Sequence, residues 1–365
     1  MVTVRVPLTA GRDASYDVLI GPGLLDRLPG LLAERCPAAA YAVIADDVVA
    51  PRYAAPLVER LAGQGRRAAL LSFPSGESSK TRTTWGELTD RMLAERFGRD
   101  AAVIAVGGGV TGDLAGFVAA TYLRGVPVVQ VPTSLVAMID AAVGGKTGID
   151  APAGKNLVGA CHQPRFVACD TATLATLPER AFADGMAEAL KHGAIADADY
   201  FGFLETTTSA LAARESGAVE RLVRRSVEIK AAVVAADERE AGQRAILNFG
   251  HTVGHAIEAA SQYRVSHGTA VATGMVAEAR IGEALGITAA GTAERLRTAL
   301  PRFGLAVAAP LDVPTVLRHM SADKKSRDGA LRFALITRVG QAHRSTDGAW
   351  TMPVETAVIR TAITA

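Results

Sequence analysis

A glycine-rich segment that follows an apolar run restricts the folds open to this chain. Residues 101–106 are Ala-Ala-Val-Ile-Ala-Val, glycines follow at 107, 108, 109 and 112, and the apolar segment 114–122 predicts a helix. A buried strand that ends in glycines and opens a helix lets main-chain amides approach a phosphate at the helix N-terminus. The segment therefore predicts nucleotide binding. Taken alone, the same spacing also fits a tight turn.

The surrounding sequence predicts more strands and helices of the same kind. Expected strands are 2–6, 16–20, 41–45, 67–73 and 126–131, with helical stretches at 23–35 and 51–64. Strands that alternate with helices imply a parallel sheet with right-handed crossovers. An acidic residue usually follows the glycine turn by about 20 positions, but the chain reads Gln130-Val-Pro-Thr133 there. The nucleotide would therefore be bound by a variant of the usual arrangement.

The composition changes after Thr176-Leu-Pro178, where strand-like runs give way to long amphipathic helices up to about residue 320. We expect two domains, residues 1–178 and 179–365. The predicted fold is an α/β N-terminal Rossmann-like nucleotide-binding domain followed by a mainly α-helical metal-binding domain.

The helical half concentrates ionisable residues in Ala- and Val-rich sequence. His251 and His255 are four apart and would share one helix face, with His267 a little further on. Two histidines on such a helix also fit a purely structural role. Glu188 together with two or three imidazoles, however, is the ligand set of a catalytic zinc-type site. Lysines and arginines nearby would suit a polyanionic substrate.

Three polar segments leave two interpretations open. Glu77 and Lys80 in Ser75-Gly-Glu-Ser-Ser-Lys80 could contact the nucleotide or form a solvated loop. Lys146 and Lys155 lie in glycine-rich, loop-like sequence that fits either a phosphate pocket or exposed lysines. The same choice between a site and an ordinary charged turn applies to Asp323-Lys-Lys325.

Composition limits the class of protein. The net charge is +2 with interspersed charges, which does not favour nucleic-acid binding. No apolar run reaches the roughly 18 residues of a membrane-spanning helix, and the N-terminus has no signal-peptide core. We therefore expect a cytoplasmic protein without nucleic-acid or membrane partners. Three cysteines, Cys36, Cys161 and Cys169, suit a reducing compartment and are expected to be packing residues.

Six ordered motifs resemble those of 3-dehydroquinate synthase, of the sugar-phosphate cyclase superfamily, between about residues 15 and 340. They are Gly107-Gly-Gly-Val-Thr-Gly-Asp113, Asp140-Ala-Ala-Val-Gly-Gly-Lys146, Gly154-Lys-Asn156, Met186-Ala-Glu-Ala-Leu-Lys191, Asn248-Phe-Gly-His-Thr-Val-Gly-His255 and His267-Gly268. Many members have Asp-Ser-Ser and His-Gly-Glu where this chain has Asp140-Ala-Ala142 and His267-Gly-Thr269. Neither difference removes a residue with an expected role.

The resemblance implies conversion of 3-deoxy-D-arabino-heptulosonate 7-phosphate to 3-dehydroquinate and phosphate, in the shikimate pathway. Such a carbon–oxygen lyase uses NAD catalytically with a divalent metal, usually zinc or cobalt. A hydroxyl is oxidised transiently, phosphate is eliminated, the ketone is reduced, and an intramolecular aldol reaction closes the ring.

The resemblance also implies roles for individual residues. Metal ligands would be Glu188, His251 and His267. Residues expected at the substrate are Arg124, Asp140, Lys146, Asn156, Lys191, Lys230, Arg244, Asn248, His255 and Lys324, with Glu240 as a support. NAD would meet Asp46, Glu77, Lys80, Gly109, Val110, Asp113, Thr133, Ser134, Lys146, Lys155 and Thr176. Arg124 would reach the neighbouring subunit of a homodimer.

Three alternatives predict different chemistry. An aminodehydroquinate synthase, or another sugar-phosphate cyclase of secondary metabolism, would need similar anion contacts; Lys146, Asn248 and Lys324 favour a carboxylated substrate. An iron- or zinc-dependent alcohol dehydrogenase would combine similar domains but produce net NADH. A non-catalytic binding protein would not need both a metal set and a nucleotide turn.

Overall fold

The computed structural model describes residues 1–8, 14–307, 313–322 and 331–364. The chain forms two compact units. The first comprises Met1–Leu177 and Val219–Ala235, and the second comprises Pro178–Ala218 and Ala236–Ala365.

The first unit is built on a seven-stranded sheet with the order β1-β2-β9-β6-β5-β3-β4. The strands are β1 (Val2–Val6), β2 (Tyr16–Gly21), β3 (Ala40–Asp46), β4 (Arg67–Phe73), β5 (Ala101–Gly107), β6 (Val128–Pro132) and β9 (Phe166–Asp170). Strand β1 is antiparallel to β2, and all other neighbours are parallel. The expected parallel α/β architecture is thereby confirmed.

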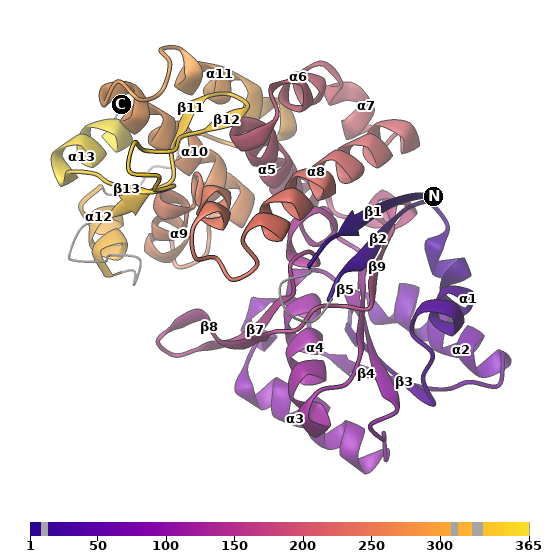
Figure 1. Ribbon diagram of the computed structural model, residues 1–365. Helices are drawn as coiled ribbons and strands as arrows, with labels where there is room; N and C mark the ends of the chain where they lie inside the picture. Colours follow the sequence, from indigo (N-terminus) through magenta and orange to yellow (C-terminus); the bar gives the residue numbers. More distant parts are fainter. Residues whose placement is uncertain (9–13, 308–312, 323–330, 365) are drawn as a thin grey trace. The chain divides into compact units, whose positions relative to one another are not determined.

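Helices cover both faces of this sheet (Figure 1). They are α1 (Leu24–Arg35), α2 (Ala55–Gly63), α3 (Arg82–Ala94) and α4 (Gly109–Thr121). Alternate residues of each buried strand enter opposite cores, as in β3, where Val43 packs with α1 and α2 while Ile44 packs with α3 and α4. Burial on both faces explains why these strands are apolar without interruption. Short helical turns complete the connections: η1 (Ala50–Ala54), η2 (Glu77–Ser79), η3 (Tyr122–Arg124), η4 (Ala137–Ala141) and η5 (Thr171–Thr176).

An antiparallel hairpin of β7 (Lys146–Ala151) and β8 (Gly154–Cys161) replaces the loop expected around Lys146 and Lys155. Glycines obscured its strand pattern. They are needed because the two backbones approach closely: a Cβ on Gly159 would lie 2.0 Å from the carbonyl oxygen of Thr147. The exposed side chain of Cys161 also differs from the expected packing role, whereas Cys36 and Cys169 are buried.

Most of helix α8 (Ser216–Ala236) belongs to the first unit, although the expected division placed it in the second. One reason is visible in Lys230, whose ammonium group donates to the main-chain oxygen of Asp140 at 2.6 Å and to its carboxylate at 2.5 Å. The sequence break after residue 178 could not reveal this return of the chain.

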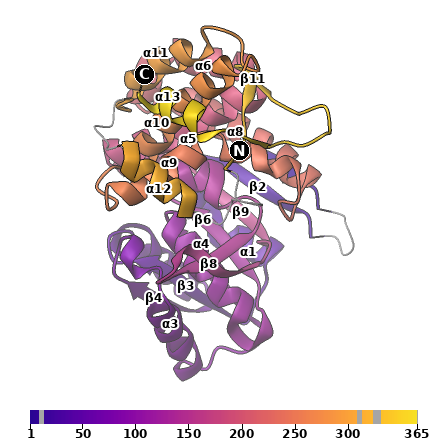
Figure 2. The same cartoon turned by 90° about the vertical axis from the view of Figure 1, so that its left-hand side faces the viewer.

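The second unit is mainly helical. Its helices are α5 (Glu179–Ala196), α6 (Ala198–Thr206), α7 (Thr208–Ala212), α9 (His251–Ala260), α10 (His267–Ala284), α11 (Thr292–Ala299), α12 (Val313–Ala322) and α13 (Thr356–Thr364), with the turns η6 (Gln243–Asn248) and η7 (Leu300–Phe303). Helix α10 packs against both α5 and α9 (Figures 1 and 2).

Two short antiparallel pairs complete the second unit. They are β10 (Arg332–Phe333) with β13 (Met352–Pro353), and β11 (Ile336–Arg338) with β12 (Gln341–Ala342). Strands β10 and β11, which are separated by only two residues, thus belong to two different small sheets. Across the residues that the structure describes, no helix is both long and apolar enough to cross a membrane.

Candidate metal and nucleotide sites

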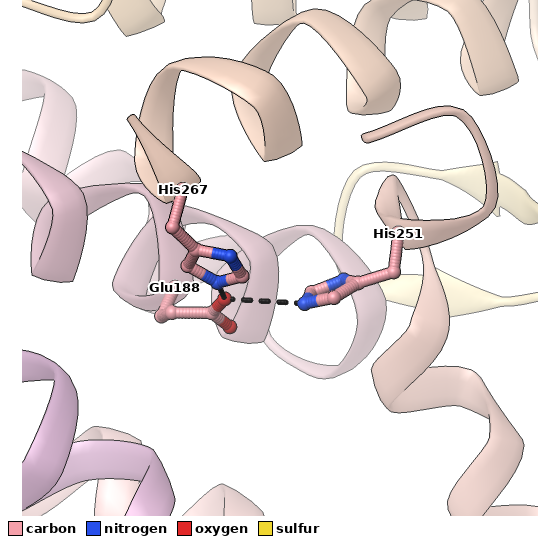
Figure 3. Close-up of side chains that lie close together, drawn as sticks. All are labelled: Glu188, His251 and His267. Atoms are coloured by element: carbon pink, nitrogen blue, oxygen red, sulfur yellow. Dashed lines mark hydrogen bonds and ion pairs between the residues drawn. The ribbon is translucent and has the colours of Figure 1, made fainter. Parts of the chain in front are cut away.

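Glu188, His251 and His267 converge within the second unit (Figure 3). They come from the middle of α5 and from the first residues of α9 and α10. The Nε2 atoms of His251 and His267 lie 3.3 and 3.0 Å from the same oxygen, Oε1 of Glu188. All three ligand atoms lie within 4.8 Å of one another. Two imidazoles and one carboxylate are a donor set for a catalytic divalent metal with a position left for substrate.

Contacts on the other ring nitrogens orient both histidines. Nδ1 of His251 lies 3.3 Å from the carbonyl oxygen of Phe249, and Nδ1 of His267 lies 3.5 Å from Oε2 of Glu258. An Nδ1–H that donates to an oxygen leaves Nε2 as the lone-pair atom, which is the usual arrangement for a metal-bound histidine. Once His267 has lost its proton and a metal is bound, the two Nε2 atoms would therefore present lone pairs to the same point.

The carboxylate of Glu188 is held in its ionised form. Burial alone would raise the pKa of Glu188, but the ammonium of Lys191 and hydrogen bonds from both histidines hold the pKa well below its usual range. Its second oxygen forms an ion pair with Lys191. That oxygen nevertheless accepts no well-oriented hydrogen bond from the described residues. A buried carboxylate with unused acceptor capacity fits a metal ligand.

The two histidines differ in protonation, and this difference predicts a pH dependence of metal binding. Burial lowers the pKa of His251, assisted by Lys191. Burial also opposes the charge on His267, but hydrogen bonds to Glu188 and Glu258 outweigh it and raise the pKa of His267 to about 10. The metal-free protein therefore holds His267 as a cation at neutral pH, and metal binding must displace that proton.

We expect zinc binding between pH 7 and 9 to release about one proton from His267 and to strengthen about tenfold per pH unit. His251 contributes no proton in this range because its pKa is lowered. Calorimetry of the chelator-treated protein in buffers of different ionisation enthalpy measures the proton count. Binding with the same affinity at pH 7 and pH 9 would show that His267 is already neutral.

Glu278, a residue that the sequence did not single out, fixes the start of the helix that carries His251. Its fully buried carboxylate accepts hydrogen bonds from the main-chain nitrogens of Gly250 at 2.7 Å and Val253 at 3.1 Å. A carboxylate at a helix N-terminus satisfies unpaired amides and interacts favourably with the helix dipole. Glu258 was likewise missed as the partner of His267. In the sequence, Glu258 and Glu278 are marked only as acidic residues within apolar helical segments.

The segment before α9 holds two predicted substrate residues. The carboxylate of Asp237 accepts from the main-chain nitrogen of Arg244 at 2.9 Å, and the Arg244 guanidinium donates to the carbonyl oxygen of Glu238 at 2.7 Å. Asn248 donates to Oε1 of Glu240 at 3.2 Å, in keeping with a supporting role for Glu240. His255 lies one turn beyond His251, with 5.2 Å between the ring centroids, but its side chain is exposed.

In the first unit, the predicted nucleotide residues follow the carboxyl ends of neighbouring parallel strands. Asp46 ends β3, Glu77 and Lys80 follow β4, Gly109 begins α4 directly after β5, Thr133 and Ser134 follow β6, and Thr176 follows β9. Ligands of open α/β sheets bind at this edge. A Cβ on Gly108 would lie 3.4 Å from Oγ of Ser134, so the glycine turn runs close to the end of β6.

Five of the predicted residues in the first unit form a polar cluster. Lys80 donates to Oδ2 of Asp113 at 2.5 Å and to the side-chain oxygen of Asn156. Lys155 forms an ion pair with Glu77 at 3.4 Å. Burial raises the pKa of Asp113 and opposes the charge on Lys80, but Asp113 raises the pKa of Lys80 in return. Asn156, expected at the substrate, thus shares a lysine with the expected NAD residues.

The remaining predicted residues are more dispersed. Arg124 and Lys146 are exposed, in η3 and at the start of β7. Val110 lies in the first turn of α4. Lys324 lies outside the described residues.

Two family models match consecutive parts of this chain. Residues 70–184 match the family model described as 3-dehydroquinate synthase N-terminal, and residues 185–326 match 3-dehydroquinate synthase C-terminal. A relative from Halorhodospira halophila, named 3-dehydroquinate synthase, is 48% identical over 332 residues, which cover 90% of this chain and 92% of the relative.

Two solved structures of high similarity are synthases with NAD⁺ and a divalent metal bound. A 2-deoxy-scyllo-inosose synthase complexed with carbaglucose-6-phosphate, NAD⁺ and Co²⁺ is 28% identical, with a TM-score of 0.90 and 99% of each chain covered. The 2-epi-5-epi-valiolone synthase of Streptomyces hygroscopicus subsp. jinggangensis 5008, with NAD⁺ and Zn²⁺ bound, is 30% identical, with a TM-score of 0.87 and 98% of each chain covered. Together with the two matching family models, these likenesses show that the chain belongs to the 3-dehydroquinate synthase family.

Proposed function

We propose that this chain converts 3-deoxy-D-arabino-heptulosonate 7-phosphate to 3-dehydroquinate and phosphate. The observation that carries the proposal is the convergence of Glu188, His251 and His267 in a chain 48% identical to a 3-dehydroquinate synthase. The 2-deoxy-scyllo-inosose synthase and the 2-epi-5-epi-valiolone synthase are less similar, at 28% and 30% identity. The substrate would therefore be the carboxylated heptulosonate phosphate.

The residues present fit both groups that the family uses. The three convergent donors would hold a divalent metal, zinc or cobalt, and the carboxyl edge of the parallel sheet would hold NAD. When bound, NAD supplies a reversible hydride acceptor, and the metal supplies Lewis-acid polarisation of an oxygen. Two solved relatives that bind NAD⁺ with Co²⁺ or Zn²⁺ support this assignment.

The chain's own side chains would bind the charged ends of the substrate and exclude water. Lys191 is 2% exposed, so its ammonium lies in a low-dielectric environment where an anion interacts strongly with it. Arg244 is also buried, and its guanidinium donates to the carbonyl oxygen of Glu238, which fixes the guanidinium before substrate arrives. Lys230 holds the Asp140 carboxylate by a direct hydrogen bond, which would fix its position beside the reacting hydroxyl.

The family resemblance also supports a homodimer in the cytoplasm, with Arg124 reaching the partner's site. To reach the partner's site, the Arg124 side chain must extend away from its own subunit. The side chain is exposed, as this requires.

Product identification tests the proposed activity. The protein with NAD and zinc or cobalt is given the heptulosonate phosphate, and separately its amino analogue. We expect stoichiometric phosphate and 3-dehydroquinate from the first substrate, without NADH accumulation at steady state. Turnover of the amino analogue alone would support the secondary-metabolic alternative, and net NADH formation would support a dehydrogenase. No turnover of either substrate would refute the proposal.

A further inference from the structure

The helical unit contains a cavity of about 660 Å³ whose wall is formed by the first half of α5, the end of α7, the start of α10 and the turn η7. None of its lining residues has a role in the proposed reaction. The volume is within the range of about 300–1,000 Å³ typical of small-molecule sites. Two phenylalanines, Phe182 and Phe303, supply apolar wall.

The charged side chains of this cavity are strongly unbalanced. Four arginines line it, Arg180, Arg214, Arg264 and Arg302, against a single carboxylate, that of Glu179. Within the described part of the chain, none of the four forms an ion pair, and their hydrogen bonds go to main-chain carbonyl oxygens. Carbonyl groups do not neutralise a guanidinium, and one carboxylate cannot balance four arginines, so the cavity lining keeps a net positive charge.

Two of these arginines are held in place by the protein. The guanidinium of Arg214 stacks on the ring of Phe182 at 3.5 Å and donates to the carbonyl oxygen of Ala212 at 2.9 Å. Its Nε is buried without a hydrogen-bond acceptor among the described residues. Burial lowers the pKa of Arg214, against the opposing charge of Glu179. Arg180 donates to the carbonyl oxygen of Arg264 at 3.4 Å, which brings these two side chains together.

Two long helices also begin at this cavity. Glu179 is the first residue of α5, and the Ser266 side chain caps α10 by accepting from the nitrogen of Thr269. The partial positive charge of both N-termini adds to that of the arginines.

We propose that this cavity binds a small polyanion with at least two phosphate or carboxylate groups. Planar guanidinium groups bind such groups through two parallel hydrogen bonds, and several arginines favour a ligand with more than one anionic group. The site is distinct from the metal ligands, although it shares α5 and α10 with them.

Calorimetry with inorganic pyrophosphate and with citrate tests this site in the full-length protein loaded with zinc and NAD. The double variant R180Q/R302Q removes two exposed charges, and we expect it to bind at least one of the two probes tenfold or more weakly than the wild type. The matched control R360Q, an exposed arginine of α13 outside the cavity, should bind both probes normally. Unchanged binding of both probes to the double variant would overturn the proposal.

A second variant introduces a charge without removing an arginine. T269E places a carboxylate in the cavity and completes a capping box with Ser266, which favours folding of α10. We expect T269E to raise at least tenfold the Kd for the probe whose binding R180Q/R302Q weakens. R244Q, which is altered at the proposed substrate site, should bind this probe at the cavity with unchanged Kd. Calorimetry measures binding and not turnover. Binding of pyrophosphate or citrate at this cavity can therefore be shown even if the protein does not cyclise the heptulosonate phosphate.

Discussion

Replacing His267 with alanine is expected to remove the bound metal and to lower kcat by about 10³-fold or more, while the Kd for NAD changes less than about twofold. The loss of rate follows because Lewis-acid stabilisation contributes several kcal/mol, and each 1.4 kcal/mol is about tenfold. NAD is assigned to the first unit, and His267 belongs to the second. Metal content is measured by mass spectrometry, and NAD binding by fluorescence titration.

Two further variants separate loss of a ligand from a general effect of substitution. E258Q keeps an acceptor for Nδ1 of His267 but removes its charge, and should weaken metal affinity about 10-fold to 100-fold without abolishing it. His319 of α12 is exposed, so H319A should keep full metal content. Full metal stoichiometry in H267A would show that the ligand set is wrong.

The fold of the first unit was largely predictable because its central strands β3 and β5 are apolar and end at Asp46 and Gly107. A strand followed by Gly107-Gly-Gly109 leaves few alternatives to a helix on a parallel sheet. The hairpin of β7 and β8 was not predicted, since strands with glycines at points of close approach lack an alternating pattern. The return of α8 to the first unit depends on contacts far apart in sequence, such as that between Lys230 and Asp140.

The candidate site was predictable in a different way. Residue types grouped Glu188 with two or three of the histidines, and spacing made His251 and His255 equivalent. Only the family resemblance chose His251 and His267 and moved His255 to the substrate. The structure gives a physical basis for the difference, because Nε2 of His251 faces Glu188 whereas the side chain of His255 is exposed. Glu258 and Glu278 were missed because a single acid in an apolar helix does not reveal which amide or imidazole it contacts.

The close contact between α9 and α10 predicts that substitution of Gly274 strongly destabilises the helical unit. Gly274 faces the turn before α9, and a Cβ there would lie 1.9 Å from the carbonyl oxygen of Gly250 and 2.9 Å from the nitrogen of Gly254. Both are main-chain atoms, so the conflict cannot be relieved by rotating a side chain. Gly250 has φ of +81°, a conformation that favours glycine, and it directly precedes His251.

We therefore expect G274A to destabilise the helical unit by about 3 kcal/mol, the upper end for overpacking, and to lower its Tm by roughly 6–12 °C. Metal affinity should fall as well, because separating α9 from α10 moves His251 relative to His267. Differential scanning calorimetry and zinc titration measure the two effects.

The matched control is G202A in α6, where an added Cβ meets no atom within 4 Å. Alanine stabilises a helix interior by about 0.5–1 kcal/mol relative to glycine, so G202A should raise Tm slightly. Equal Tm values for G274A and wild type would mean that the helices can separate at little cost, and the position of His251 would then not depend on this contact.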